Sequence, residues 1–315
     1  MLHLGRLRLL HEFSVLGTIS AVAEAVHLTR PAVSQQLDLL EKELNLTLFQ
    51  REGRHIRLTP IAEHLARRSE DLFRTVNDIE GELAATQSEV TGELRMAAFS
   101  SILIGLLPDI VSYLNGQYPH LRVSMRELSA AQGVKEVATN QVDIAVAHDL
   151  DAVESCLHAV EVVPYCTDYH YLVVSSRHRM AGKNSVKLEE LRGEHWIFNL
   201  FSAGYHRELS KSFALAGYEP DILYNCHDML VTLELVRKNV AVTMMPGLSL
   251  RSVRNDPDYS FIAIEPKLAR KIFLAVQKGS LKKPSIRAVI DALVRRIPAD
   301  LGDWYLSKET EQEAP

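Results

Sequence analysis

Polar side chains between residues 29 and 35 have the chemistry needed to bind DNA. Thr29, Arg30, Pro31, Ser34 and Gln35 leave short or planar polar groups at the start of a predicted helix. In the major groove arginine pairs bidentately with guanine and glutamine with adenine, and each such pair discriminates by roughly 1–3 kcal/mol. The N-terminal end of a recognition helix is the end that enters this groove. We therefore predict that these five residues contact DNA.

Arginines follow in a predicted two-stranded hairpin, or wing. Arg51, Arg54 and Arg57 surround the turn at residues 52–53, with apolar residues on both sides. Guanidinium groups placed beside a recognition helix bind phosphates, and such binding is independent of sequence and weakened by salt. We expect Arg51 and Arg54 to make these backbone contacts.

A helix-turn-helix must hold these side chains in place. The hydroxyls of Thr18 and Thr29 can cap two successive helices, and Pro31 fits the first turn of the second, where a missing N–H does no harm. The second helix is predicted over residues 30–44. One apolar stripe runs along it, formed by Val33, Leu37, Leu40 and Leu44. A solvated polar face on an ordinary three-helix bundle is the alternative, and the basic wing favours DNA.

Residues 4–63 resemble the DNA-binding domain of LysR-type transcriptional regulators. The resemblance rests on Phe13 and on the segments at residues 17–20, 28–34, 40–44, 48–51 and 58–59. It implies DNA contacts at Arg30, Pro31, Ser34, Gln35 and, in the wing, Arg54. The chain departs from the family in having Arg30 in place of glutamine, Asn45 in place of glycine and Glu63 in place of glycine. Asparagine tolerates the left-handed conformation that ends such a helix.

Length and composition favour a protein with more than one domain. The chain has 315 residues and a net charge of −5, so positive charge for DNA must be local. We find no signal peptide or membrane-spanning stretch, and the three cysteines show no metal-type spacing. We expect a cytoplasmic protein with no membrane partner, and we divide it into a winged helix-turn-helix domain (1–59), a linker (60–91), an effector domain (92–300) and a polar tail (301–315).

The linker is predicted to form a dimerisation helix that ends near residue 88. Thr59 can cap it, and Pro60 suits its first turn. Apolar residues follow at heptad spacing, namely Leu65, Leu72, Val76, Ile79 and Leu83. The pattern favours a homodimer or homotetramer over the alternative, a helix packed only on its own chain.

From residue 92 onward, short apolar strands alternate with helices, which is typical of an α/β fold. This segment also resembles the LysR family, whose effector domain has two lobes joined by crossing strands, like a periplasmic binding protein. The resemblance implies one lobe from 92–163 and 269–300 and a second lobe from 164–268. We expect the chain to cross between the lobes near 159–164 and 263–269.

In such a fold a ligand binds between the lobes, at the ends of strands and the starts of helices. Polar residues at those places are Ser100, Ser101, His148, Asn199, Ser202 and Thr243. The hydroxyls of Ser100 and Ser101 can hold a carboxylate, and they can equally serve as helix caps. We predict a small, anionic effector of unknown identity, with no resident cofactor.

Three other functions are weighed against an effector-responsive regulator. Redox sensing would use Cys156 and Cys166, which are separated by nine residues and lie on either side of the first crossing strand. Metal sensing would use Cys166 with His170, or Cys226 with His227 and Asp228, but neither a C-x-x-C nor an H-E-x-x-H motif occurs. An enzymatic or solute-binding α/β domain fused to a helical bundle is the third, and phosphate-binding loops and nucleophile elbows do not occur. We therefore predict no catalytic residues, no metal site and a ligand-responsive, DNA-binding transcriptional regulator.

Overall fold

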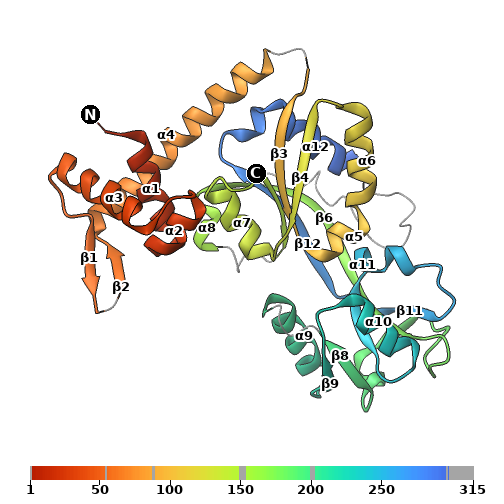
Figure 1. The fold of residues 1–315 in the computed structure, drawn as a ribbon. Coiled ribbons are helices and arrows are strands. Elements are labelled where there is room, and N and C mark those ends of the chain that lie inside the picture. Colours follow the sequence, from red (N-terminus) through yellow and green to blue (C-terminus); the bar gives the residue numbers. More distant parts are fainter. Residues whose placement is uncertain are drawn as a thin grey trace. The chain divides into compact units, whose positions relative to one another are not determined.

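The computed structural model describes residues 2–53, 55–86, 89–148, 154–198, 203–295 and 297 (Figure 1). The chain divides into two compact units. Unit 1 comprises Met1–Ala98, Tyr113–Val163 and Leu274–Leu293, and unit 2 comprises Phe99–Ser112, Pro164–Phe273 and Val294–Pro315. Among the described residues, no helix combines the length and the apolar character needed to cross a membrane.

Unit 1 begins with three helices and a hairpin, as the sequence predicts for a winged helix-turn-helix. The elements are α1 (Leu4–Leu16), α2 (Ile19–Ala25), α3 (Arg30–Leu44), β1 (Phe49–Glu52) and β2 (His55–Leu58). Thr18 and Thr29 accept hydrogen bonds from the backbone N–H groups of Ala21 and Ala32, which confirms both predicted caps. Asn45 ends α3 in the left-handed conformation (φ 52°).

The core of this domain forms where the apolar stripe of α3 meets α1 and α2. Val33, Leu37 and Leu40 are at most 2% exposed, and they pack with Leu10 and Phe13 of α1. Burial of each such side chain contributes roughly 1.5–3 kcal/mol. The opposite face carries the exposed polar residues Gln35 and Asp38.

Helix α4 (Pro60–Ala85) joins the helix-turn-helix to the rest of unit 1. Thr59 caps it as predicted, through the N–H of Ala62. One face packs on the chain itself: Gly81 is buried, and a Cβ there would lie 2.9 Å from Cβ of Lys282. Lys282 and Lys283 also pair with acidic residues of α4. One face of α4 therefore packs on its own chain, as the alternative prediction states.

The remainder of unit 1 contains a parallel sheet in which β3 (Gly92–Ala98) lies between β4 (Leu121–Glu127) and β5 (Ile144–His148). Helices accompany these strands, as expected for an α/β domain. They are the C-terminal part of α6 (Leu107–Gln117), α7 (Ala130–Ala138), α8 (Glu154–Leu157) and α12 (Pro284–Arg295), with the 3₁₀ segment η4 (Ser280–Lys282).

Unit 2 is built on the second part of β6 (Val160–Ser175). Strands β10 (Thr243–Pro246) and β11 (Tyr259–Glu265) pair with it in antiparallel orientation. The other strands are β7 (Ser185–Lys187), which is parallel to β11, and the parallel pair β8 (His195–Phe198) and β9 (Asp221–Asn225). The helices are α5 (Ser100–Gly105), α9 (Ala203–Leu215), α10 (Met229–Arg237) and α11 (Gly247–Leu250), with the 3₁₀ segments η2 (Leu188–Leu191) and η3 (Arg251–Val253).

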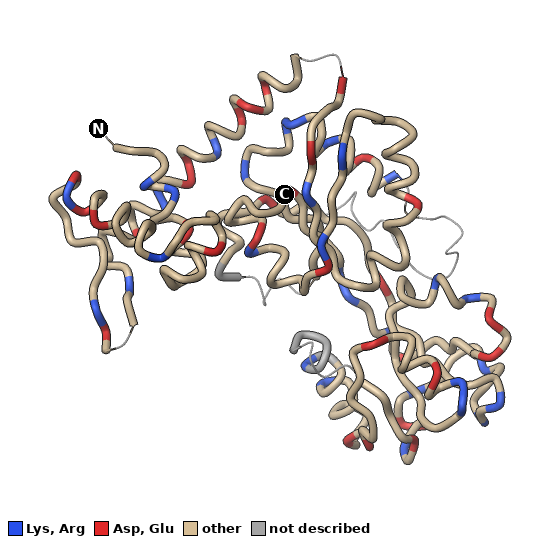
Figure 2. The backbone as a smooth tube through the Cα atoms, in the orientation of Figure 1, with Lys and Arg blue, Asp and Glu red and all other residues tan. Residues whose placement is uncertain are grey.

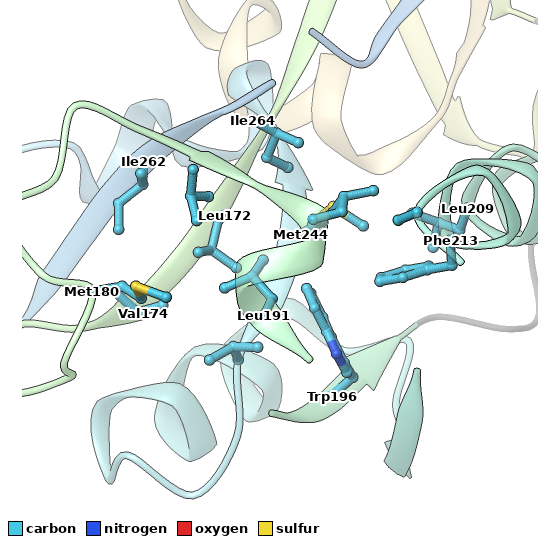
Figure 3. Packing of buried hydrophobic residues seen from close by; sticks show 14 of the residues in the cluster. Leu172, Val174, Met180, Leu191, Trp196, Leu209, Phe213, Met244, Ile262 and Ile264 are labelled. Carbon is cyan, nitrogen blue, oxygen red and sulfur yellow. The ribbon is translucent and has the colours of Figure 1, made fainter. Parts of the chain in front are cut away.

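Aromatic packing stabilises the core of unit 2 (Figure 3). Trp196 of β8 stacks on Phe198 at 5.1 Å between ring centroids, and Phe213 of α9 meets Trp196 edge to face. Leu172 and Met244 bring β6 and β10 into the same cluster. Residues 171–174 of β6 and 196–198 of β8 therefore lie in the core.

Two strands, β6 and β12 (Ala269–Gln277), run from one unit into the other, and further boundaries at Ala98–Phe99 and Ser112–Tyr113 assign α5 and the start of α6 to unit 2. The first passage, between Val163 and Pro164, lies within the predicted crossing at 159–164. The second lies between Phe273 and Leu274, later than the predicted crossing at 263–269. The reason is that β11 stays paired with β6 and β7 through residues 259–265, so the chain leaves unit 2 only on the next strand.

Candidate nucleic-acid interface and effector site

The first turns of α3 present the predicted DNA-reading residues together. Arg30, Pro31 and Gln35 are exposed, and Ser34 is half-buried beside them. Thr29 is also exposed, and its hydroxyl oxygen accepts the N–H of Ala32 at 3.3 Å, so this residue also sets where α3 begins. The polar groups expected to meet base edges thus lie on one accessible face.

The wing lies beside this face, with basic residues on both of its strands (Figures 1 and 2). Arg51 is exposed on β1, and Arg57 of β2 forms an ion pair with Glu52 (Nε to Oε2, 2.7 Å). Both partners of that pair are more than 60% exposed. Glu52 therefore offsets the positive charge that Arg57 adds to the wing. Arg54 lies outside the described residues.

A carboxylate of α3 fixes the position of the wing. Oε1 of Glu41 accepts the backbone N–H groups of Leu48 at 2.6 Å and Phe49 at 3.1 Å, where β1 begins. Hydrogen bonds to a charged acceptor are about twice as strong as neutral ones. The hollow between α3 and β1 is lined by Ile19, Ser34, Leu37, Asp38, Glu41, Phe49, Gln50, Arg51 and Ile56. Recognition helix and wing thus form one surface.

In unit 2 the predicted effector residue Ser101 belongs to a buried polar network. Nη2 of Arg270 donates to Oγ of Ser101 at 2.5 Å and to Oδ2 of Asp168 at 2.7 Å. Nε of Arg270 donates to the same carboxylate oxygen at 3.1 Å. The side chain of Asp168 is 1% exposed and that of Arg270 10%. Removing one partner of such a buried pair costs roughly 3–5 kcal/mol.

The network is held by two short helices that approach each other closely. Oδ1 of Asp168 accepts the N–H of Leu248 in α11 at 3.2 Å. A Cβ on Gly105 of α5 would lie 2.4 Å from the carbonyl oxygen of Leu248, so this contact requires glycine. The ring of Phe99 lies 4.8 Å from the Arg270 guanidinium carbon. Phe99, Ser101 and Arg270 therefore form one preorganised cluster.

The other predicted effector residues are distributed differently. Ser100 is exposed at the start of α5, next to the cluster. Thr243 is 3% exposed, and its hydroxyl donates to the carbonyl of Ile197 at 2.7 Å, so it serves packing between β10 and β8. His148 ends β5 in unit 1. Asn199 and Ser202 lie outside the described residues.

The three cysteines carry free thiols. Cys156 and Cys166 are buried. Burial raises the pKa of the Cys166 thiol well above its usual value, and the negative charge of Asp168 acts in the same direction. Because the thiolate is the reactive form, this environment disfavours oxidation of Cys166. Among the described residues, no group of three or more His, Cys, Asp or Glu side chains is arranged to hold a metal ion.

Comparison with protein families identifies both halves of the chain. The model of the LysR substrate binding domain matches residues 87–298. The model of the bacterial regulatory helix-turn-helix protein, lysR family, matches residues 4–63. This chain belongs to the LysR family. As a LysR-type transcriptional regulator, it combines a DNA-binding domain with a domain that binds an effector.

Relatives of this LysR-type regulator are themselves regulators of transcription. The transcriptional dual regulator GltC of Bacillus subtilis is 27% identical over 68% of this chain and 71% of its own length. The hydrogen peroxide-inducible genes activator of Haemophilus influenzae is 26% identical over 82% and 85%. The relatives thus favour a regulator over the alternative of an enzyme.

Solved structures of LysR-type regulators share the fold. The full-length structure of a single-substitution variant of OxyR from Pseudomonas aeruginosa aligns over 100% of this chain and 99% of the OxyR chain, at 17% identity and a TM-score of 0.68. The structure of CbnR in complex with its target DNA aligns over 94% of this chain and 99% of the CbnR chain, at 22% identity and a TM-score of 0.52. The solved structures thus show a shared fold, and the two family models confirm the resemblance inferred from sequence motifs.

Sequence reasoning missed three residues of these sites. Arg270 and Asp168 lie far from Ser101 in the chain, and only the pairing of β12 with β6 brings them together. Glu41 belongs to a motif that the sequence analysis used for the resemblance, but its contact with β1 needs the folded wing. A charged residue in the middle of an apolar strand, such as Asp168 in β6, is the signal that would have indicated a buried partner.

Proposed function

We propose that this LysR-type regulator binds DNA as a homo-oligomer in the cytoplasm and responds to a small anionic molecule. The predicted DNA contacts are Thr29, Arg30, Pro31, Ser34, Gln35, Arg51 and Arg54. Pairing of two copies through α4 would place two recognition helices on one duplex. A ligand that favours one conformation of the effector domain would then change how the paired DNA-binding domains fit DNA.

The observation that carries this proposal is an exposed apolar stripe on α4. Leu72, Val76, Ile79 and Leu83 are 42%, 38%, 51% and 64% exposed. They recur at the i, i+4, i+7 and i+11 positions, so they lie in one row, while Gly81 on another face is buried against Lys282. A continuous exposed apolar row at heptad spacing is typical of a helix that pairs with another helix. A second copy of α4 is the partner that fits this row.

Further exposed apolar side chains, on β9 and α10, support assembly into a homotetramer. Leu223 of β9 is 50% exposed, and Leu230 and Val231 of α10 are 71% and 48% exposed. Strand β9 has β8 as its partner in a two-stranded sheet, so one edge of it remains open among the described residues. Open edges and apolar patches of this kind mark interfaces between chains.

The cluster around Arg270 supports an anionic effector. Arginine carries five N–H donors, and the described contacts of Arg270 use only Nε and Nη2. Nη1 makes no hydrogen bond to any residue that the structure describes. A carboxylate ligand would be attracted by the guanidinium group and would accept hydrogen bonds from the hydroxyls of Ser100 and Ser101.

A metabolite screen tests the ligand response of the whole chain. A ligand that binds only the folded protein raises its melting temperature, and 100-fold excess over Kd stabilises by about 2.7 kcal/mol. We expect small organic acids to raise the melting temperature and their amides or methyl esters to leave it unchanged. If neutral compounds were the only ones to stabilise the protein, the proposed anionic class would be wrong.

Replacement of Gln35 tests base reading by α3. We expect Gln35→Ala to lower affinity for a specific duplex by about tenfold and to relax the preference at one base pair, with the fold intact. Titration of labelled specific and random duplexes would measure the effect. Equal losses on both duplexes would mean that Gln35 contacts only the DNA backbone.

Replacement of Ser101 tests the effector site. We expect Ser101→Ala to weaken binding of the effector found in the screen by about tenfold or more, because a hydrogen bond to a charged group is worth roughly 1.5–3 kcal/mol. Affinity for DNA without effector should be unchanged. Calorimetric titration measures the first quantity, and Ser176→Ala, at an exposed turn of unit 2, is the control. Wild-type effector affinity combined with lower thermal stability would assign Ser101 a purely structural role.

A further inference from the structure

An acidic residue lies on the face of α3 that carries the predicted DNA contacts. Asp38 follows Ser34 by four residues and Pro31 by seven, so the three side chains form one row along the helix. Asp38 is exposed. It lines the hollow between α3 and β1 together with Ser34, Gln50 and Arg51. Its carboxylate therefore points toward the surface that the recognition helix and the wing form together.

The carboxylate of Asp38 has no basic partner among the residues that the structure describes. It makes no ion pair and no hydrogen bond to the residues that the structure describes, although Arg51 lines the same hollow. Three other acids of the domain are engaged within it: Glu41 accepts two backbone N–H groups, Glu43 pairs with Arg6, and Glu52 pairs with Arg57. The carboxylate oxygens of Asp38 thus stay available as hydrogen-bond acceptors for a molecule that binds this face.

A free carboxylate is unfavourable beside DNA unless the duplex supplies a hydrogen-bond donor. Phosphates repel it, and the major-groove edge of guanine presents only acceptors at N7 and O6. Adenine has a donor at N6, but its acceptor N7 lies next to it. Cytosine N4 is the amino group that aspartate pairs with most favourably in the major groove. A carboxylate at this place favours one base and disfavours the others.

We propose that Asp38 determines specificity by accepting a hydrogen bond from cytosine N4 at one base pair of each half-site. The inference deepens the DNA-binding function, and it rests on the proposed entry of α3 into the major groove. Asp38 also lowers affinity for duplexes that lack this cytosine, because its charge is then left without a donor. Asp38 therefore raises affinity for duplexes that have this cytosine and lowers affinity for duplexes that lack it.

Selection of duplexes from a random library by the full-length protein, followed by sequencing, tests this proposal. The wild type is expected to select a C·G pair at one position per half-site, with about tenfold preference over the other pairs. Asp38→Asn should change the preferred pair at that position to A·T, because asparagine pairs bidentately with adenine. Asp38→Ala should leave no preference there and should bind random duplexes severalfold more tightly.

Glu43→Gln is the matched control, since it removes one negative charge from the same helix at a side chain that pairs with Arg6 of α1. It should select the same sites as the wild type. If Asp38→Asn and Asp38→Ala also select wild-type sites, Asp38 reads no base and the proposal is wrong. The proposal would also be contradicted if both variants bound all duplexes more tightly and kept the base preference of the wild type. Asp38 would then only repel the DNA backbone. Failure of the wild type to select any motif would instead refute base reading by α3 as a whole.

Discussion

Ile79→Asp is expected to separate the copies of this regulator that associate through α4. Ile79 is 51% exposed in the middle of the stripe formed by Leu72, Val76, Ile79 and Leu83. A second helix packed on this stripe would bury the new carboxylate in apolar surroundings, which costs several kcal/mol per copy. A loss of about 4 kcal/mol raises the dissociation constant roughly 1,000-fold.

Sedimentation velocity of the full-length protein measures the outcome. The wild type should sediment as four copies, or as two if the surface at β9 and α10 does not associate, and Ile79→Asp should halve that mass. Ile79→Leu keeps the stripe apolar and should retain the wild-type mass. Ala85→Asp introduces the same carboxylate at an exposed position of α4 that faces away from the stripe and should also retain it. An Ile79→Asp protein with the wild-type mass would show that α4 does not hold the copies together.

A buried carboxylate in α1 leads to the second large effect, on stability. Glu12 is 1% exposed, and Nε of Arg8 lies 3.7 Å from its Oε1. Oε2 is buried and finds no hydrogen-bond partner among the described residues. Burial raises the pKa of Glu12 to about 8, against the smaller opposing effect of Arg8. The folded protein therefore holds a proton on Glu12 at a pH where the unfolded chain has released it.

This shift makes stability fall as the pH rises. The contribution of Glu12 is fully present below its usual pKa, near 4.5, and is lost as the pH rises to about 8. A difference of that size corresponds to roughly 3–5 kcal/mol. Glu12→Gln stays neutral at every pH. Above pH 8 we therefore expect its free energy of unfolding to exceed that of the wild type by that amount.

The neighbouring His11 dictates which pH values to compare. Burial lowers the pKa of His11 to about 4, so its effect on stability is confined to pH values below its usual pKa of 6.5. Urea unfolding followed by far-UV circular dichroism at about pH 6.5 and 8.5 therefore isolates Glu12. The free energy of unfolding of the wild type should fall by about 2 kcal/mol between these pH values, and that of Glu12→Gln should hardly change. Glu24→Gln, at an exposed site on α2, is the control, and an equal loss in all three proteins would contradict the assignment.

The sequence predicted the parts of the fold that rest on local signals. Helix α3 has the predicted limits because Thr29 caps it, Asn45 ends it and its apolar period runs through Leu40. The wing follows the predicted turn, and α4 begins at Pro60 as expected. The apolar stripe of α4 was also predicted, because heptad spacing is visible in one sequence and does not depend on the partner.

Features that depend on distant contacts were not predicted. Strand β9 alternates exposed and half-buried residues over a short stretch, and its pairing with β8 depends on residues far away in the sequence. Thr243 looked polar and accessible, but its hydroxyl bonds to the carbonyl of Ile197 inside the core. Ser101 was predicted to meet a ligand directly, whereas its hydroxyl first accepts a hydrogen bond from Arg270. A single sequence does not show which distant residue such a side chain will bond to.

Hydroxyl-radical footprinting of a duplex selected by the full-length protein tests the central claim most directly. If two copies joined through α4 each place one α3 in the major groove, two protected half-sites should appear. Their centres should lie about one helical turn apart, roughly 34–36 Å, or a multiple of that distance. Addition of the effector found by the metabolite screen should change the protection between or beside these half-sites. A single protected half-site, identical in the presence and absence of effector, would contradict the account.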